Sequence, residues 1–400
     1  MKKSILSLLL SLLFVLSGYS QTITWTKVWS TPAGSPNPFY NGYHDIHWSD
    51  YIGRVLINST RTAGNTDSIY SDRLWFFDPV ASTAQLIQDN GQLSSGSCVP
   101  DLTNTPGTRH PVGQIWVDKA RNRLWMMEGV CQGHILPDMW YYQLDNPISG
   151  HSDWIQVHPA HLPTSTVGGL HGIFNNASVV HDTDHDAFIL FGYDGGSNSH
   201  AMQVYCDTSL NGGILTPEQI SVGCSISDDW TDITSQVTLN GPLPPGYYYP
   251  NLEYATIQHR VIQFAGLHGA TTIENQTWDY DPVLKKWANE NPLNPPANSS
   301  DNNENGRVAH AYDTDDGNYY YHLTAHTPGY GLAPSRPPED WRYNLTANIW
   351  TKLDTGNGPY LSESMTYIGN GMFVAWAAKV NSDGKYYATG IAEMWIGKIQ

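Results

Sequence analysis

A short aromatic segment with a Trp near its start recurs along this sequence, and it constrains the fold more than any other feature. The five clear copies contain Trp75, Trp140, Trp278, Trp341 and Trp395. A weaker copy, which lacks Trp, covers residues 201–206. Short segments rich in aromatic residues favour β-strands. Because the unit repeats along most of the chain, the sequence indicates a repeat architecture in which neighbouring units share one core.

A hairpin rich in Asp, Gly and Asn precedes five of these six copies, all except the one with Trp278. Its turns lie near Asp50–Gly53, Asp118–Asn122, Asp182–Asp186, Asp313–Asn318 and Gly369–Gly371. These residue types tolerate positive φ and bond their own backbone, as a tight hairpin requires. A further Trp follows several aromatic segments, at Trp154, Trp287 and Trp350. Each unit is therefore predicted as strand, hairpin, strand, loop, Trp strand, turn and outer strand.

This unit corresponds to one four-stranded blade of a β-propeller, and it recurs about every 55 to 75 residues. We predict blades over residues 43–88, 110–158, 173–235, 252–290, 307–353 and 361–400. The last blade lacks an outer strand, whereas residues 22–29 form a strand without a blade. We therefore expect one all-β propeller of about six blades, closed by its N-terminal strand, with no helix in the domain.

The Trp-strand and hairpin pattern, with the Gly-rich segment at residues 191–196, resembles the kelch and galactose-oxidase-like propeller superfamily. The resemblance covers nearly all of the chain beyond residue 20. It implies the fold of a kelch-type propeller. It implies no single activity, because propellers host oxidases, lyases, epimerases, glycosidases and non-catalytic binding modules.

The first 20 residues have the pattern of a secretory signal peptide. Lys2 and Lys3 precede an apolar run, residues 4–16, that is too short to span a bilayer. We expect cleavage after Ser20, a propeller domain over residues 21–400, and secretion to the periplasm or the extracellular space. The net charge of −17, with only 20 Lys and Arg, disfavours general binding to nucleic acid. We expect a monomer with no membrane span.

Four cysteines in an exported chain most simply form two disulfides, for which three connectivities exist. In the propeller that the resemblance implies, Cys98 and Cys131 lie in two loops on one face of the second blade. We expect these two to pair. Cys206 and Cys224 flank an insertion in the third blade, and we expect them to close it at the opposite end or at the rim.

The resemblance also implies a face for the functional site, because the innermost strand of each blade lines a central channel. The loops that enter these strands share one face with the loops between the second and third strands. The catalytic candidates on this face are His110, His134, His310 and Tyr193. The substrate-binding candidates are Arg109, Arg307, His44, His171, Asn175, Asn251 and Glu363.

These residue types suit an acidic polysaccharide. Neutral His can take or return a proton near neutral pH, and Arg can bind a carboxylate through two hydrogen bonds. A lyase that cleaves uronic-acid glycans needs both, and Trp and Tyr could stack on sugar rings. We therefore expect a secreted carbohydrate-active propeller, with a polysaccharide lyase as its most concrete form.

Other interpretations of the same residues stay open. A non-catalytic module could bind a glycan or a protein with the same face. Trp and Tyr at repeat positions also serve as blade core, and His at strand starts also caps backbone groups. Glycoside hydrolysis by two carboxylates is poorly supported, since Glu253 and Glu363 are the only obvious acids near the inner-strand starts.

No cofactor is required by the sequence, although a bound metal stays open. His44 and His47 are three residues apart, so in a strand they point to opposite faces and form a poor chelate. Tyr321 and His322 match one part of the copper-radical oxidase site of the superfamily. That site also needs a later histidine, and His326 is the only histidine that follows them in the sequence. The copper-radical oxidase is therefore a weaker alternative.

Overall fold

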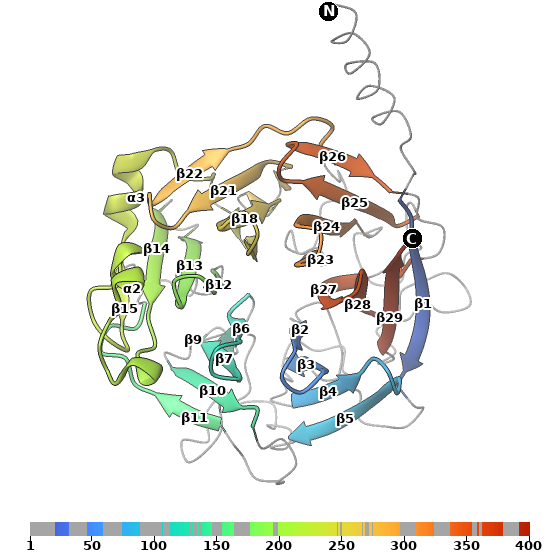
Figure 1. Cartoon of the computed structure of the whole chain (residues 1–400), viewed down its shortest axis with the longest axis horizontal. Helices are drawn as coiled ribbons and strands as arrows, with labels where there is room; N and C mark the ends of the chain where they lie inside the picture. The colour runs from blue at the N-terminus through green and yellow to red at the C-terminus, as the bar shows by residue number, and fades with distance from the viewer. Residues whose placement is uncertain are drawn as a thin grey trace, which may run out of the picture.

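Six four-stranded antiparallel sheets form a ring around one axis, so the structure is a six-bladed, all-β propeller (Figure 1). It is a computed structural model. The residues that it describes are 21–31, 46–58, 74–88, 106, 113–127, 130–131, 134–135, 138–145, 154–163, 177–194, 199–245, 247–248, 250–265, 267–268, 272–273, 275–296, 309–323, 337–353, 358–359, 362–378 and 392–400. The predicted signal peptide, residues 1–20, lies outside them. The predicted fold class is confirmed.

Each blade runs from an inner strand at the axis to an outer strand at the rim. Blade 1 consists of β2 (Ile46–Ser49), β3 (Arg54–Asn58), β4 (Leu74–Asp78) and β5 (Thr83–Gln88). Blade 2 consists of β6 (Ile115–Asp118), β7 (Arg123–Met127), β10 (Met139–Gln143) and β11 (Trp154–Val157). Blade 3 consists of β12 (Ser178–Asp182), β13 (Ala187–Asp194), β14 (Ser199–Tyr205) and β15 (Trp230–Asp232).

The second half of the chain repeats this plan. Blade 4 consists of β17 (Asn251–Ala255), β18 (Arg260–Phe264), β21 (Thr277–Asp281) and β22 (Lys286–Asn289). Blade 5 consists of β23 (Ala309–Tyr312), β24 (Asn318–Leu323), β25 (Glu339–Asn344) and β26 (Ile349–Lys352). Blade 6 consists of β27 (Ser362–Gly369), β28 (Met372–Ala378), β29 (Ala392–Ile399) and the N-terminal strand β1 (Ile23–Ser30).

The N-terminal strand closes the ring, as predicted. β1 pairs with β29 in antiparallel register from Ile23 opposite Ile399 to Ser30 opposite Glu393. The backbone N–H of Gln400 also donates to the carbonyl of Thr22 at 3.0 Å. Figure 1 shows the blue β1 beside the red β29 at the rim. The edge that β29 would otherwise expose is therefore covered.

Aspartates at strand ends build many of the turns. The Asp118 carboxylate, at the end of β6, accepts the backbone N–H groups of Ala120 and Arg121 at 3.0 and 3.2 Å. The same arrangement recurs at Asp78, Asp182, Asp281 and Asp313. Because the side chain satisfies the turn's own donors, each Asp sets a strand end locally. These turns give the repeat its regular spacing.

Aromatic side chains hold neighbouring blades together. The ring of Phe264 in blade 4 lies 4.5 Å from that of Trp350 in blade 5, and Phe191 in blade 3 lies 5.2 Å from Trp287 in blade 4. The third-strand residues Trp75, Trp140 and Trp278 are buried, as expected for blade core. Trp75, Trp140 and Trp278 therefore fill space between blades, whereas Trp341 and Trp395 are half-buried.

Helices occur where the sequence analysis expects none. After β14, blade 3 carries α2 (Pro217–Ser221) and, after β15, α3 (Thr234–Asn240), with the 3₁₀ turn η2 (Ser209–Asn211) between β14 and α2. A capping box joins Thr216 and Gln219 at the start of α2. Two short helices lack the length that makes apolar periodicity visible, which explains the error. No helix in the described ranges is long and apolar enough to cross a membrane.

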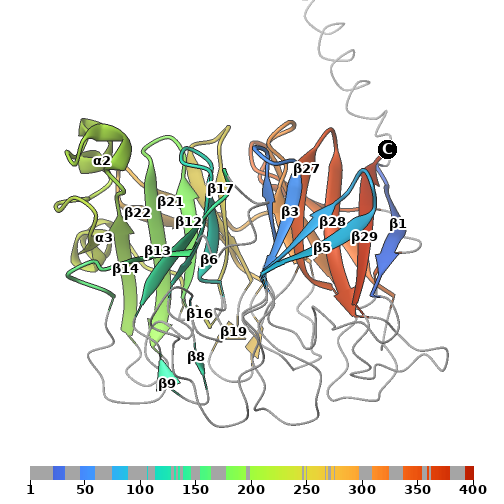
Figure 2. The ribbon, with the colours of Figure 1, turned by 90° about the horizontal axis from the view of Figure 1, so that it is seen from below.

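The insertion that carries α2 is fastened to the hairpin end of the ring (Figure 2). A disulfide joins Cys206 and Cys224, which confirms this predicted pair. The Gln219 amide donates to the carbonyls of Asp186 and Asp207 at 3.2 and 3.3 Å. Since Asp186 lies in the turn between β12 and β13, the insertion sits at the end where the inner hairpins turn. This is the end opposite to the inner-strand starts.

Candidate functional site

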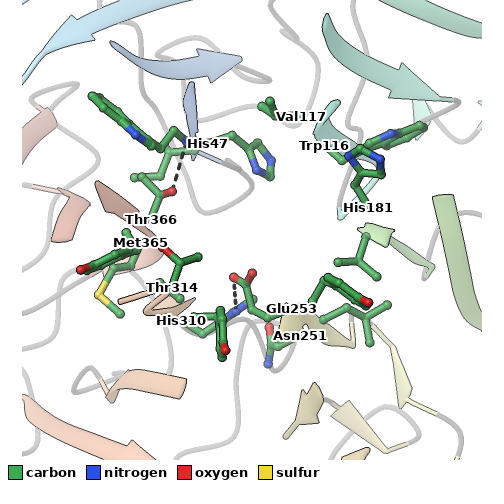
Figure 3. A pocket seen from close by; sticks show the side chains of 18 of the residues that line it. His47, Trp116, Val117, His181, Asn251, Glu253, His310, Thr314, Met365 and Thr366 are labelled. Atoms are coloured by element: carbon green, nitrogen blue, oxygen red, sulfur yellow. Dashed lines mark hydrogen bonds and ion pairs between the residues drawn. The ribbon is translucent and has the colours of Figure 1, made fainter. Parts of the chain in front are cut away.

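The six inner strands surround a cavity of about 350 Å³ on the ring axis. All of them contribute to its wall, from β2 in blade 1 to β27 in blade 6. Figure 3 shows polar side chains that enter this space from several blades. A cavity of this size is in the range of small-molecule and sugar sites. It is therefore the candidate functional site.

His310 and Glu253 form a pair in the cavity wall. His310, on β23, places its Nδ1 3.1 Å from Oε1 of Glu253 on β17, which belongs to the neighbouring blade (Figure 3). The imidazole also stacks on Tyr319 of β24, with ring centres 5.7 Å apart and an interplanar angle of 15°. The His310 and Glu253 side chains are 19% and 29% exposed. The ring is thus held on two sides and open to the cavity on its remaining edge.

Two more histidines line the same wall, from alternate blades. His47 lies on β2 and His181 on β12, and Figure 3 shows both beside the cavity. Asn251, at the start of β17, donates its side-chain amide to the carbonyl of Phe264 at 3.1 Å. Proton-transfer groups and amide groups therefore face one space, which suits a ligand rich in hydroxyl groups.

One group of possible metal ligands lies behind this wall. Within the described ranges, only Asp118, His181 and Asp186 place three ligand atoms within 4.8 Å of one another. Arg121 already fills the space between the two carboxylates, because it donates to Asp118 at 3.1 Å and to Asp186 at 2.6 and 2.7 Å. A metal ion would have to displace this cation. We therefore assign the group to an ion network.

The network joins blades 2 and 3 at the hairpin end. The Arg121 side chain, which is only 2% exposed, also lies 3.2 Å from Oδ1 of Asp207, and Arg123 contacts Oδ2 of Asp207 at 2.6 Å. Burial alone would raise the pKa of Asp186. The hydrogen bond and the charge of Arg121 instead hold the pKa of Asp186 well below its ordinary value. The wall beside His181 is therefore fixed by charge pairs.

Tyrosines fasten three further hairpin turns on this side of the ring. Each donates its hydroxyl to a turn residue of the preceding blade: Tyr254 to Asp184 at 2.7 Å, Tyr312 to Gln258 at 2.9 Å, and Tyr367 to Asp315 at 2.6 Å. Burial raises the pKa of all three phenols, so they stay protonated donors. The hairpin end of the cavity is thus built from cross-blade contacts that keep its shape.

The His185 and Asp182 pair in the same region should make stability depend on pH. Nδ1 of His185 lies 2.7 Å from Oδ2 of Asp182, and this hydrogen bond raises the pKa of His185. The pair therefore stabilises the fold below about pH 6.5, and its contribution is lost as pH rises through the raised value. We expect the Tm difference between wild type and His185→Gln to shrink between about pH 6 and pH 8. A difference that stays constant over this range would contradict the assignment.

The structure places some of the predicted site residues and leaves others outside its described part. His310 and Asn251 line the cavity. The backbones of His134, Tyr193 and Glu363 lie in β9 (His134–Ile135), β13 and β27, but their side chains are not among those described. The candidates that lie outside the described residues are His44, Arg109, His110, His171, Asn175 and Arg307. The Cys98–Cys131 disulfide stays a prediction, since Cys98 is outside them as well and only the backbone of Cys131 is described, in β8 (Val130–Cys131).

Sequence reasoning missed His181 and the role of Glu253. His181 directly precedes the Asp that caps its turn, the place that Tyr312 occupies in blade 5. Aligning the blades on these capping aspartates would have placed His181 on the channel wall. The pairing of Glu253 with His310 has no such signal, because it depends on how two blades meet.

A scan against models of known protein families found no match, and a search of curated proteins found none that matches. The propeller architecture therefore stands on the structure. Because one propeller fold hosts many chemistries, the activity has to be argued from the cavity.

Proposed function

We propose that this chain is an exported kelch-type propeller that binds a polysaccharide at its axial cavity and cleaves it by elimination. The observation that carries the proposal is the His310 ring, which is fixed by Glu253 and Tyr319 and open to a cavity of about 350 Å³. An imidazole that is held in place and reaches a ligand-sized space is suited to proton transfer. Asn251 and the other polar groups of the wall suit sugar hydroxyls.

The proposed chemistry is β-elimination on a uronic-acid unit. Nε2 of His310 takes the proton from C5, and the C–H electron pair forms the C4–C5 double bond. The C4–O bond breaks with its electron pair on the leaving oxygen, which takes a proton from a second group, for which we propose Tyr193 or His134. Arg109 and Arg307 are proposed to neutralise the sugar carboxylate.

The test is to mix the mature protein with a panel of uronic-acid polysaccharides and to follow the ultraviolet absorbance of the unsaturated product. We expect absorbance to rise with at least one substrate. His310→Ala should slow the reaction by at least about a hundredfold while leaving binding in place. His259→Ala is the matched control, because this histidine is 64% exposed and lies on the turn between β17 and β18.

The same panel separates the alternatives. Binding without any unsaturated product would replace the lyase with a non-catalytic glycan-binding module. If no polysaccharide binds and none is cleaved, the proposed function is wrong. Equal loss of activity in His259→Ala and His310→Ala would mean that the cavity is not the site.

A further inference from the structure

We infer that Glu253 is a positioning residue, which holds the His310 imidazole with its proton on Nδ1 and its lone pair on Nε2, facing the cavity. The catalytic use of this arrangement rests on the proposed function. The arrangement itself does not, since it follows from the contacts of the two side chains.

The Nδ1 side of the His310 ring faces Glu253. Nδ1 of His310 is buried and forms no hydrogen bond within the described residues, and the charged atom beside it is Oε1 of Glu253, at the ion-pair distance of 3.1 Å. An ionised carboxylate can only accept hydrogen bonds. The negative charge of Glu253 at this distance favours the N–H dipole on Nδ1 in the neutral ring, and Nε2 is left as the basic nitrogen.

The neighbours of the His310 ring also oppose its turning over. Tyr319 is 0% exposed and lies nearly parallel to His310, so one face of the imidazole is covered. Burial raises the pKa of Tyr319 well above its ordinary value, which keeps its ring neutral. The covered face and the carboxylate both oppose a rotation that would exchange Nδ1 and Nε2.

The remaining edge of the His310 ring faces the cavity. The His310 side chain is 19% exposed, and it belongs to the cavity wall. Because Nδ1 is buried, the edge that can reach a ligand is the one that bears Nε2 (Figure 3). Glu253 acts on the reaction through His310, and therefore it positions the base.

Kinetics give the first test. Glu253→Gln should lower kcat by about 10²- to 10⁴-fold, because an amide can also stabilise the wrong tautomer, while KM stays within about twofold. Glu253→Asp, which keeps the charge on a shorter side chain, should restore part of kcat. Glu218→Gln makes the same chemical change on α2, away from the cavity, and should leave both constants unchanged. A rise in KM with kcat unchanged would make Glu253 a binding residue and would overturn the inference.

Nitrogen-15 NMR of labelled histidine gives a second test that needs no substrate. At about pH 8, where an ordinary imidazole is neutral, His310 should show a protonated Nδ1 and an unprotonated Nε2. Glu253→Gln should shift this tautomer equilibrium toward the Nε2-protonated form, and Glu218→Gln should not. If wild-type His310 carries its proton on Nε2, or if Glu253→Gln leaves the tautomer unchanged, the inference is wrong. If the tautomer behaves as expected but no polysaccharide is cleaved, the positioning role stands and the proposed function fails.

Discussion

Replacing Arg121 by Ala should lower the free energy of unfolding by about 3 to 5 kcal/mol, since it leaves buried charges without their partner. The guanidinium contacts three carboxylates, those of Asp118, Asp186 and Asp207, and its side chain is 2% exposed. Without Arg121, Asp118 and Asp186 face each other at the junction of blades 2 and 3 without the guanidinium that contacts both. Urea unfolding followed by Trp fluorescence would measure the change.

Arg121→Lys should recover only a small part of this loss. Arg121 donates to Asp118 from one nitrogen and to both oxygens of Asp186 from two, and its Nε donates to Ser209 at 3.1 Å. A single ammonium group cannot reproduce this planar arrangement of donors. The insertion that begins at Cys206 is held through Asp207, so its attachment should weaken as well.

The matched control is Lys119→Ala, in the same turn. Lys119 lies 3.2 Å from Asp50 of blade 1, but the two side chains are 49% and 65% exposed. Solvent screens such a pair, and we expect a change of about 0 to 1 kcal/mol. An equal loss of unfolding free energy in Arg121→Ala and Lys119→Ala would show that burial does not set the strength of the Arg121 network.

The fold could be predicted from the sequence because its determinants are local. A Trp recurs in five of the six third strands and an Asp in most of the turns at similar offsets, and each turn Asp acts within its own blade. Asp118 bonds the next turn of its own chain, which makes its role visible from neighbouring residues. Ring closure was predictable by matching an outer strand that is missing at the C-terminus with a strand left over at residues 22–29.

The site could be predicted only in part, because its contacts cross between blades. His310 and Asn251 stand near inner-strand starts, and this place is enough to bring them to the cavity. The pairing of His310 with Glu253 depends on how β17 and β23 are offset along the axis, and the repeat in the sequence does not show this offset. Arg121 likewise lies in a polar turn, where the sequence suggests an exposed side chain. In the structure Asp207, at the start of the insertion in blade 3, contacts the guanidinium and helps to bury it.

Trp25→Ala should lower the free energy of unfolding by about 3 to 5 kcal/mol, because it leaves a cavity where the indole packs β1 against the rest of the ring. The indole is 1% exposed, and its Nε1 donates to Oδ2 of Asp340 in blade 5 at 2.8 Å. It lies over Gly397 of β29, where any Cβ would come within 2.8 Å of the ring. The residue therefore joins the N-terminal strand to the C-terminal strand and to the neighbouring blade.

Trp25→Phe separates packing from the hydrogen bond. A phenyl ring keeps much of the contact with Gly397 but leaves one oxygen of the buried Asp340 without the indole donor, while His322 still lies 2.6 Å from the other oxygen. We expect this variant to lose about 1 to 3 kcal/mol. Thr26→Ala, at an exposed residue of the same strand, should change stability by no more than about 0.5 kcal/mol. If Trp25→Ala proves as mild as Thr26→Ala in urea unfolding, β1 contributes little to ring closure. A larger loss for Trp25→Ala than for Trp25→Phe would show that shape, in addition to the bond to Asp340, holds the strand in place.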